Sequence, residues 1–212
     1  MNNKELEELI KRYPLLKPIE STIYEAFMLL KNLYENDGVL YVCGNGGSHA
    51  DAEHIVGELM KGFKIKRSLS DDLKQKFEKK LGKEGRIIAE RLEQGLRTIS
   101  LHSNPALISA FINDVHSDLA YAQQLSVLGR PGDVVLGLTT SGNSTNIVET
   151  FKVANVLGIK VIAMTGEEGG TCSKWVDIHI KAPSKITHVV QEYHLPIYHT
   201  LCLMLEDEFY GE

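Results

Sequence analysis

Residues 39–60 read VLYVCGNGGSHADAEHIVGELM and combine an apolar run, a glycine-rich turn and a longer helical stretch. The run Val39–Val42 predicts a buried β-strand, because consecutive apolar residues suit a strand that is covered on both faces. The glycines of the turn 44–48 end this strand, and a helix is expected from about His49 to Met60. A strand followed by a turn and a helix is the repeating unit of parallel α/β sheets, so this stretch decides the fold class.

The same order of elements recurs through the rest of the chain. Apolar runs predict further strands at 98–101, 133–138, 160–164 and 177–180, and the intervening stretches predict helices at 106–112, 145–157 and 187–209. The sequence therefore predicts an α/β fold of three layers, α/β/α, around a central parallel sheet. In such sheets ligands bind beyond the carboxyl ends of the strands, where the turns 44–48 and 139–144 both fall.

Two further segments complete the expected domain. Apolar residues at helical spacing between residues 6 and 36 predict N-terminal helices, divided by Pro14 and Pro18. Residues 64–97 are dense in charge, and Leu73, Phe77 and Leu81 recur every four residues, which predicts a helix with one apolar stripe. We expect a solvated helical insertion that packs on a neighbour rather than a binding element. The chain 1–212 is thus expected to be one domain, with 1–36 as N-terminal helices and 64–97 as a charged insertion.

Composition excludes several classes of protein. The 212 residues carry 23 Lys and Arg against 28 Asp and Glu, a formal net charge of −5, so nucleic acid and anionic membranes are not expected partners. The three cysteines are widely spaced with no CxxC pair, which is typical of a reducing cytoplasm rather than of a disulfide framework. The amphipathic N-terminus is unlike a signal peptide, and no apolar run reaches the length of a membrane span. A cytoplasmic protein is therefore expected.

The turn 139–144, TTSGNS, is the stronger of two phosphate-binding signals. Four hydroxyls surround one glycine directly after an apolar strand, and hydroxyls with backbone amides at a helix N-terminus can hold a phosphate without lysine or arginine. The alternative is N-capping by Ser141 or Ser144, but a cap needs one hydroxyl, so phosphate binding is favoured. The turn 44–48 is a weaker signal, because glycine-rich turns of this kind are common and no Walker lysine follows.

Two pairs of polar residues lie on expected helices. His54 and Glu58 are four residues apart and share one helix face, as a metal-binding pair, an acid/base pair or a surface contact would. Gln191 and His199 are two such steps apart on the last helix. Pro196 lies between them and removes one helical hydrogen bond, so a local kink is expected. The spacing alone leaves the role of both pairs open.

Taken together, four motifs resemble the sugar isomerase (SIS) domain family, and within it the phosphoheptose isomerases. The motifs are CGNGGSHADAEH at 43–54, Asn113-Asp114, TTSGNS at 139–144 and QEYH at 191–194. Their order and spacing over most of the chain make the resemblance specific. It implies a parallel five-stranded sheet flanked by helices, assembled as a homotetramer with active sites at subunit interfaces.

The resemblance also implies a role for individual residues. It implies that the sugar phosphate is held by Thr139, Thr140, Ser141 and Ser144, and that the rest of the substrate site is formed by Asn45, Gly46, Gly47, Ser48, Glu58, Asn113, Asp114 and Gln191. It implies one zinc ion per subunit, held by His54, Glu58, Gln191 and His199. The implied reaction converts sedoheptulose 7-phosphate to D-glycero-D-manno-heptose 7-phosphate through an enediol. Glu58 is the implied base and His199 the implied acid/base, roles that suit a carboxylate and an imidazole.

Four features depart from the family pattern. His188 stands where an aspartate is usual, no arginine follows closely after Glu58, the segment 64–97 is long, and Pro196 is unusual in the last helix. These departures leave open an isomerase of another ketose phosphate. They also leave open a non-catalytic SIS protein that binds phosphosugars or, like the DnaA-binding members, regulates replication.

A third alternative, nucleotide binding in a Rossmann-like domain, is weaker. It requires an acidic residue at the end of the second strand, where the sequence reads Leu101-His102-Ser103. The presence of all four residues His54, Glu58, Gln191 and His199 favours an enzyme over a binding module, which has no need of a full proton-transfer set.

Overall fold

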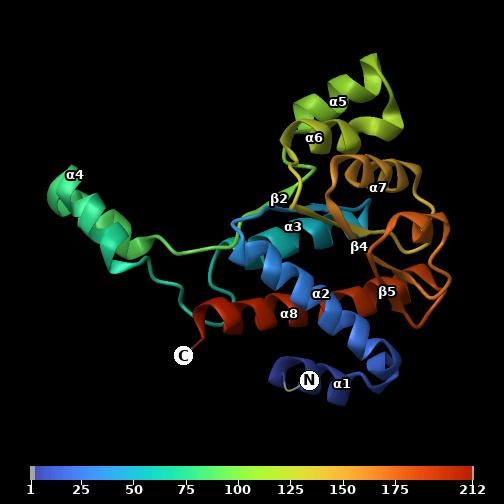
Figure 1. Ribbon diagram of the computed structural model, residues 1–212, viewed down its shortest axis with the longest axis horizontal. Coiled ribbons are helices and arrows are strands. Elements are labelled where there is room, and N and C mark those ends of the chain that lie inside the picture. Colours follow the sequence, from blue (N-terminus) through green and yellow to red (C-terminus); the bar gives the residue numbers. More distant parts are fainter. Residues whose placement is uncertain (1–2, 212) are drawn as a thin grey trace.

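A parallel sheet lies between two layers of helices in the computed structural model, which describes residues 3–211 (Figure 1). Within these residues the strands are β1 (Leu40–Cys43), β2 (Thr98–Ser100), β3 (Val134–Leu138), β4 (Lys160–Gly166) and β5 (Ile178–Ala182). Their order across the sheet is β2-β1-β3-β4-β5, and every neighbouring pair is parallel. The expected α/β/α architecture and the five-stranded parallel sheet are both confirmed.

Helices cover the two faces of the sheet and enclose two apolar cores. One core lies between the sheet and α1 (Lys4–Arg12), α2 (Glu20–Glu35), α3 (Gly47–Met60) and α8 (Thr187–Tyr210). The other lies against α6 (Ala120–Leu128) and α7 (Thr145–Leu157). Leu40 and Val42 of β1 enter the first core, and Tyr41 and Cys43 enter the second. Burial on both sides explains why the strand reads as an unbroken apolar run.

The remaining helices are shorter or lie at the edge of the body. They are α4 (Asp71–Arg91), α5 (Pro105–Asp114) and three 3-10 helices, η1 (Pro14–Ile19), η2 (Ser117–Leu119) and η3 (Thr171–Trp175). The expected division of the N-terminal helices at Pro14 and Pro18 is confirmed by η1. Helix α8 is a single helix through Pro196, and α6 was not expected from the sequence.

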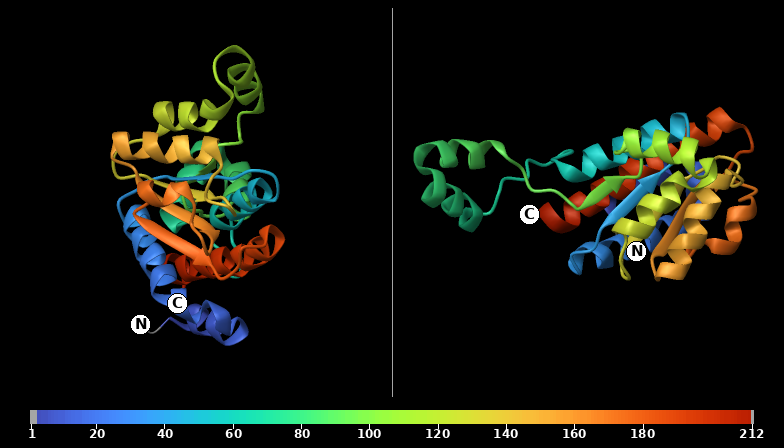
Figure 2. Two further views of the ribbon diagram at one scale, coloured as in Figure 1. Left: turned by 90° about the vertical axis from the view of Figure 1, so that its right-hand side faces the viewer. Right: turned by 90° about the horizontal axis from the view of Figure 1, so that it is seen from above.

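Helix α4 forms an arm that projects from the body of the protein (Figures 1 and 2). Its helical backbone is broken at Gly82, where φ is 63°, and the chain turns back so that Gly85 packs against the backbone of Phe77. The expected packing of the apolar stripe is not seen within this chain, because Leu73 and Leu81 are 39% and 54% exposed. The whole stripe precedes the reversal at Gly82, and it stays exposed because the arm projects away from the body of the protein.

Two further observations concern membrane-spanning helices and disulfide bonds. No helix of residues 3–211 is long and apolar enough to span a bilayer. Cys43, Cys172 and Cys202 are buried, and none of them forms a disulfide with another cysteine of the described chain.

Candidate active site

The candidate site lies where two neighbouring strands, β1 and β3, end in polar turns. The strands pair in parallel with Cys43 opposite Gly137, so the turns 44–48 and 139–144 lie side by side. Asn45 of the first turn is joined to Asn146, in the first turn of α7, because the side-chain amide of each donates a hydrogen bond of 2.9 Å to the other's oxygen. The two turns therefore form one continuous polar region at the carboxyl edge of the sheet.

The turn 44–48 is tight and depends on its glycines. A Cβ atom on Gly44 would lie 2.3 Å from the carbonyl oxygen of Ser48, and Gly46 has a φ of 56° that favours glycine. The carbonyl of Gly44 accepts a hydrogen bond of 2.9 Å from Nε2 of the buried His102. Burial lowers the pKa of His102. Ser48 is itself buried in the first turn of α3.

In the turn 139–144, the hydroxyls of Ser141 and Ser144 do not cap helix α7. Ser144 precedes α7, yet within the described residues its hydroxyl caps no amide of that helix and lies 3.0 Å from Thr139 Oγ1 instead. Ser141 Oγ accepts a hydrogen bond of 3.2 Å from the N–H of Asn143, inside the turn. The capping interpretation is therefore wrong for both serines. Hydroxyls gathered at a helix N-terminus are a phosphate-binding arrangement.

A small cavity opens beside this second turn. Its volume is about 110 Å³, and it is lined by Thr140 and Ser141 on one side and by Ser184, Lys185 and Thr187 near the start of α8 on the other. The Lys185 ammonium lies 2.9 Å from a carboxylate oxygen of Glu168 and is highly exposed. The polar lining of the cavity thus combines hydroxyls with the Asn143 amide and with Lys185, which is paired with the carboxylates of Glu167 and Glu168.

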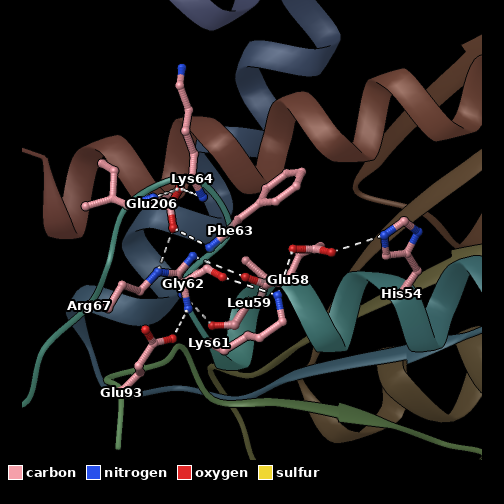
Figure 3. A network of polar contacts seen from close by, with 11 residues as sticks. His54, Glu58, Leu59, Lys61, Gly62, Phe63, Lys64, Arg67, Glu93 and Glu206 are labelled. Carbon is pink, nitrogen blue, oxygen red and sulfur yellow. Dashed lines mark hydrogen bonds and ion pairs between the residues drawn. The ribbon is translucent and has the colours of Figure 1, made fainter. Parts of the chain in front are cut away.

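His54 is held through both ring nitrogens on the face of α3 that packs against α8. Nδ1 lies 2.9 Å from the Tyr198 hydroxyl. Nε2 lies 3.1 Å from Oε1 of Glu58 (Figure 3). The Tyr198 hydroxyl donates to Asp51 Oδ1 at 3.2 Å. Because a hydroxyl has one proton, it then accepts from the Nδ1–H of His54. The Nε2 lone pair and the Glu58 carboxylate are then both acceptors, so their contact needs a proton or a metal ion shared between them.

His199 faces His54 from α8. The two ring centroids are 4.9 Å apart with the rings nearly perpendicular, and the Phe63 ring lies 5.3 Å away on another side. Burial lowers the pKa of His199, and the nearby His54 lowers it further, while Glu58 opposes the change. Its Nε2 atom is buried and has no hydrogen-bond partner among the described residues. Such an atom costs free energy unless a ligand, a water or an ion pairs with it.

The donor set fits zinc in its chemistry. Imidazole nitrogens and a carboxylate oxygen are the usual ligands of this ion, and His54, Glu58 and His199 supply these groups from neighbouring faces of α3 and α8. Gln191 is the fourth implied ligand, and its Nε2 lies 2.7 Å from the position of a Cβ on Gly47, in the first turn of α3. Within residues 3–211 no group of three His, Cys, Asp or Glu side chains is arranged closely enough to hold a metal ion. Binding zinc would therefore need side-chain rotation toward a common point.

Asn113 and Asp114 are not brought to the two turns. They are the last residues of α5, both are exposed, and Asn113 donates a hydrogen bond of 2.7 Å to Asp114. In the described part of the chain, neither forms a hydrogen bond or ion pair with the turns 44–48 and 139–144. If they contact a substrate, they would do so in another arrangement of α5 or in another subunit.

Several residues of the site were not expected from the sequence. Asp51 and Tyr198 orient His54, and Asn146 joins the start of α7 to the turn 44–48. Asp51 lies three residues before His54 and shares its helix face, so spacing contained a signal for it. Nothing in the sequence pattern marked Asn146. Lys61 is a further addition, because its ammonium lies 3.4 Å from Oε2 of Glu58.

Comparison with known proteins gives consistent matches over most of the chain. A family model described as the SIS domain matches residues 6–93 and 85–166. A phosphoheptose isomerase of Geotalea daltonii is 36% identical over 184 residues, which cover 87% of this chain and 82% of that protein. A phosphoheptose isomerase of Leptospira biflexa is 34% identical over 208 residues, which cover 98% of this chain and 94% of that protein.

A solved structure shows the same fold. A phosphoheptose isomerase from Francisella tularensis has a TM-score of 0.77 to this structure at 29% identity, and the match covers 95% of this chain and 94% of that one. The similarity in sequence and in structure thus spans the sheet, both turns and the helices α3 and α8.

Proposed function

The chain belongs to the SIS domain family, and from that premise we propose that it is a phosphoheptose isomerase, which converts sedoheptulose 7-phosphate to D-glycero-D-manno-heptose 7-phosphate. The relatives that bear this name match nearly the whole chain, which supports the same activity here. The observation that carries the proposal is the meeting of a phosphate-type turn at 139–144 with a carboxylate and two imidazoles on the neighbouring helices.

The reaction needs a base and a group that moves a proton between oxygens. Conversion of a ketose to an aldose moves one proton from C1 to C2 and another from the C1 hydroxyl to the C2 oxygen, through an enediol. In the proposed mechanism Glu58 takes the proton from C1 and returns it to C2. His199 moves the proton between the two oxygens, a task that suits an imidazole.

The other residues bind and orient the substrate. We assign the phosphate to the hydroxyls and amides of 139–144, because an acidic protein must hold an anion by local donors rather than by its overall charge. Asn45 and Ser48 line the sugar between the turns and α3. The pair formed by Asp51 and Tyr198 holds the His54 ring in one tautomer.

We also propose that the site binds one zinc ion through His54, Glu58, Gln191 and His199. The unpaired Nε2 of His199 and the His54 Nε2 directed at Glu58 support this assignment. When bound, zinc would act as a Lewis acid on the carbonyl and enediolate oxygens. Glu58 and His199 cannot be fully occupied as ligands while they move protons, so metal content and turnover have to be measured together.

A homo-oligomer, expected to be a tetramer, is part of the proposal. Helix α5 is rich in apolar residues, yet none of its described side chains is buried, and Leu107 and Ile112 are exposed. Such a face suits contact with a second copy of the chain. Light scattering on the purified protein measures the mass of the assembly, and a monomer at working concentration would contradict this part.

The activity is tested with a panel of ketose phosphates of five to seven carbons, each assayed with and without zinc. We expect turnover with sedoheptulose 7-phosphate and about one zinc per chain by metal analysis of the same sample. Glu58→Gln and His199→Ala should fold and lose turnover. Glu53→Gln is the matched control, because Glu53 lies on the same helix but pairs with His49 on its exposed side.

Two outcomes would decide against the proposal. Turnover of a shorter ketose phosphate in preference to sedoheptulose 7-phosphate would make the protein an isomerase of another sugar. Tight phosphosugar binding by the zinc-loaded protein, with no turnover of any ketose phosphate, would make it a non-catalytic binding protein.

A further inference from the structure

Arg67 is a charged residue that is almost completely buried. It is not one of the residues to which we assign proton transfer. It lies in the segment that follows α3, and the residue as a whole is 1% exposed. Its Nε lies 2.9 Å from Oε1 of Glu206, a residue of α8 that is also buried (Figure 3). The guanidinium also lies 4.7 Å from the ring of Tyr210. A buried charge of this kind is kept only where its donors are used.

The remaining donors of Arg67 bind the end of α3. Nη1 donates to the carbonyl of Leu59 at 2.7 Å, and Nη2 donates to the carbonyl of Glu58 at 3.1 Å. The last carbonyls of a helix have no partner inside the helix, so an external donor fixes the final turn. One of the two carbonyls belongs to Glu58 itself, the residue to which we assign the base.

Glu206 gathers the loop after α3 onto α8. Its carboxylate accepts hydrogen bonds from the N–H groups of Phe63 and Lys64 at 2.7 Å and of Ile65 at 3.2 Å, besides the bond from Arg67. Burial alone would raise the pKa of Glu206, but the N–H groups of Phe63 and Lys64 and the Arg67 guanidinium outweigh it and lower the pKa. The carboxylate is therefore charged and fully hydrogen-bonded at neutral pH.

The network connects the two helices that carry the proposed acid and base. Glu58 lies in the last turn of α3, and His199 lies on α8 seven residues before Glu206. Stability alone does not call for such an arrangement, because a buried ion pair is often no more stabilising than apolar residues of the same volume. A guanidinium differs from an apolar group in joining a carboxylate on α8 to two carbonyls on α3 with fixed geometry.

We propose that Arg67 is a positioning residue that, through Glu206, fixes the end of α3 and so sets the place of the Glu58 carboxylate relative to His199. This inference rests on the proposed function, in which these two groups transfer the protons. A displacement of about 1 Å at a catalytic group is enough to reduce a rate about 100-fold. Arg67 itself touches no reacting atom.

The test uses Arg67→Lys and a matched control in the full-length protein. Lysine keeps the positive charge beside Glu206, but one ammonium cannot also donate to both carbonyls of α3. The control is Lys31→Met, which removes the ion pair between Lys31 and Glu208 at 2.5 Å. Like the pair of Arg67 and Glu206, this pair involves α8, but it ties α8 to α2 rather than to the end of α3. If Arg67→Lys does not fold, the double variant Arg67→Met/Glu206→Gln removes both charges together and leaves no unpaired one.

We expect kcat of Arg67→Lys to fall about 10- to 100-fold, with KM for sedoheptulose 7-phosphate within about twofold, because the phosphate-binding turn lies on β3 and α7. Amide hydrogen exchange at residues 58–65 should become faster in this variant. Lys31→Met should keep the kcat and the exchange of wild type, even if its melting temperature falls.

A kcat of Arg67→Lys equal to that of wild type in folded protein would overturn the inference, as would an equal loss of kcat in Lys31→Met. Failure of the proposed function is a separate result, because it appears as a wild-type protein that turns over no ketose phosphate. In that case the exchange at residues 58–65 decides alone whether Arg67 holds the end of α3.

Discussion

At the scale of single residues, the hydroxyl of Ser144 at the start of α7 could either cap the helix or bind the substrate phosphate, and the two roles predict different effects of its removal. Its side chain contacts Thr139 instead of capping α7, and we assign it to the substrate phosphate. Ser144→Ala should therefore leave the free energy of unfolding within about 0.5 kcal/mol of wild type, well below the ~1 kcal/mol typical of a lost cap. The KM for the phosphosugar should rise about 10-fold, because a hydrogen bond to a charged group is worth about 1.5–3 kcal/mol. Urea denaturation and steady-state kinetics measure the two quantities.

Asn3 provides the matched control, since it is a true N-cap. Its side-chain oxygen accepts hydrogen bonds of 3.1 Å from the N–H groups of Glu5 and Leu6 at the start of α1. Asn3→Ala should cost about 1 kcal/mol of stability with no change in KM. The phosphate role of Ser144 is wrong if Ser144→Ala destabilises the protein as much as Asn3→Ala and leaves KM unchanged.

Residue patterns predicted the chemistry of the site better than its contacts. The hydroxyls of 139–144 and the pair His54/Glu58 were visible in the sequence, because residue type and helical spacing determine them. The position of Gln191 against Gly47 was not, since it depends on how α8 packs on the first turn of α3. The role of Tyr198 was hidden for the same reason, because its partners Asp51 and His54 lie on another helix.

At the scale of elements, the buried carboxylate of Glu206 ties α8 to the loop after α3. Its folded-state pKa is lowered from an ordinary 4.5, so its stabilising contribution is full above that ordinary value and is lost as the pH falls through the folded value. Glu206→Gln should lower the free energy of unfolding by about 3 kcal/mol at pH 7, the cost typical of breaking a buried pair. The difference from wild type should shrink as the pH is lowered below about 4.5.

Denaturation of both proteins between pH 7 and pH 3 measures this dependence. Glu208→Gln is the control on the same helix, because Glu208 pairs with Lys31 at a partly exposed site, and it should show a smaller loss at pH 7. A difference between Glu206→Gln and wild type that stays constant, or grows, as the pH falls would show that the carboxylate is not stabilised by its charge.

The elements that carry the site were the most predictable ones. The bounds expected for the helix 145–157 agree with α7, and the helix expected from about His49 begins two residues earlier, at Gly47. Both follow a buried strand and a glycine-containing turn, so local pattern and tertiary packing favour the same structure. The reversal at Gly82 inside α4 was not predictable, because apolar spacing does not report the sign of φ.

At the scale of the whole molecule, the anion site and the net charge act against each other. A formal charge of −5 repels a phosphosugar at long range, so affinity has to come from hydroxyls and amides at short range. Such donors lose little strength in salt compared with exposed charges. The arrangement at 139–144 is therefore consistent with an enzyme whose substrate binding does not depend on a basic surface.

The arm formed by α4 is the part of the molecule that the body depends on least. Its base is closed by contacts of its own, because Ser68 and Glu93 form an antiparallel bridge and the Gln94 side chain donates to the Ser68 carbonyl at 2.7 Å. Beyond this base, the arm projects from the body (Figure 2). Replacing residues 70–92 with a short glycine–serine turn should therefore preserve the fold, the buried pair of Arg67 and Glu206, and kcat within about twofold, since loops closed at their base tolerate large changes in length.

Light scattering of the shortened protein measures the mass of its assembly and so tests whether the arm takes part in contacts between subunits. An unchanged assembly mass, with unchanged kcat and melting temperature, would show that the arm serves neither folding nor the site. A shortened protein that keeps its circular dichroism spectrum but loses both mass and kcat would contradict this prediction. That result would mean that the exposed Leu73 and Leu81 pack on a second copy of the chain and that the site is complete only in the assembly.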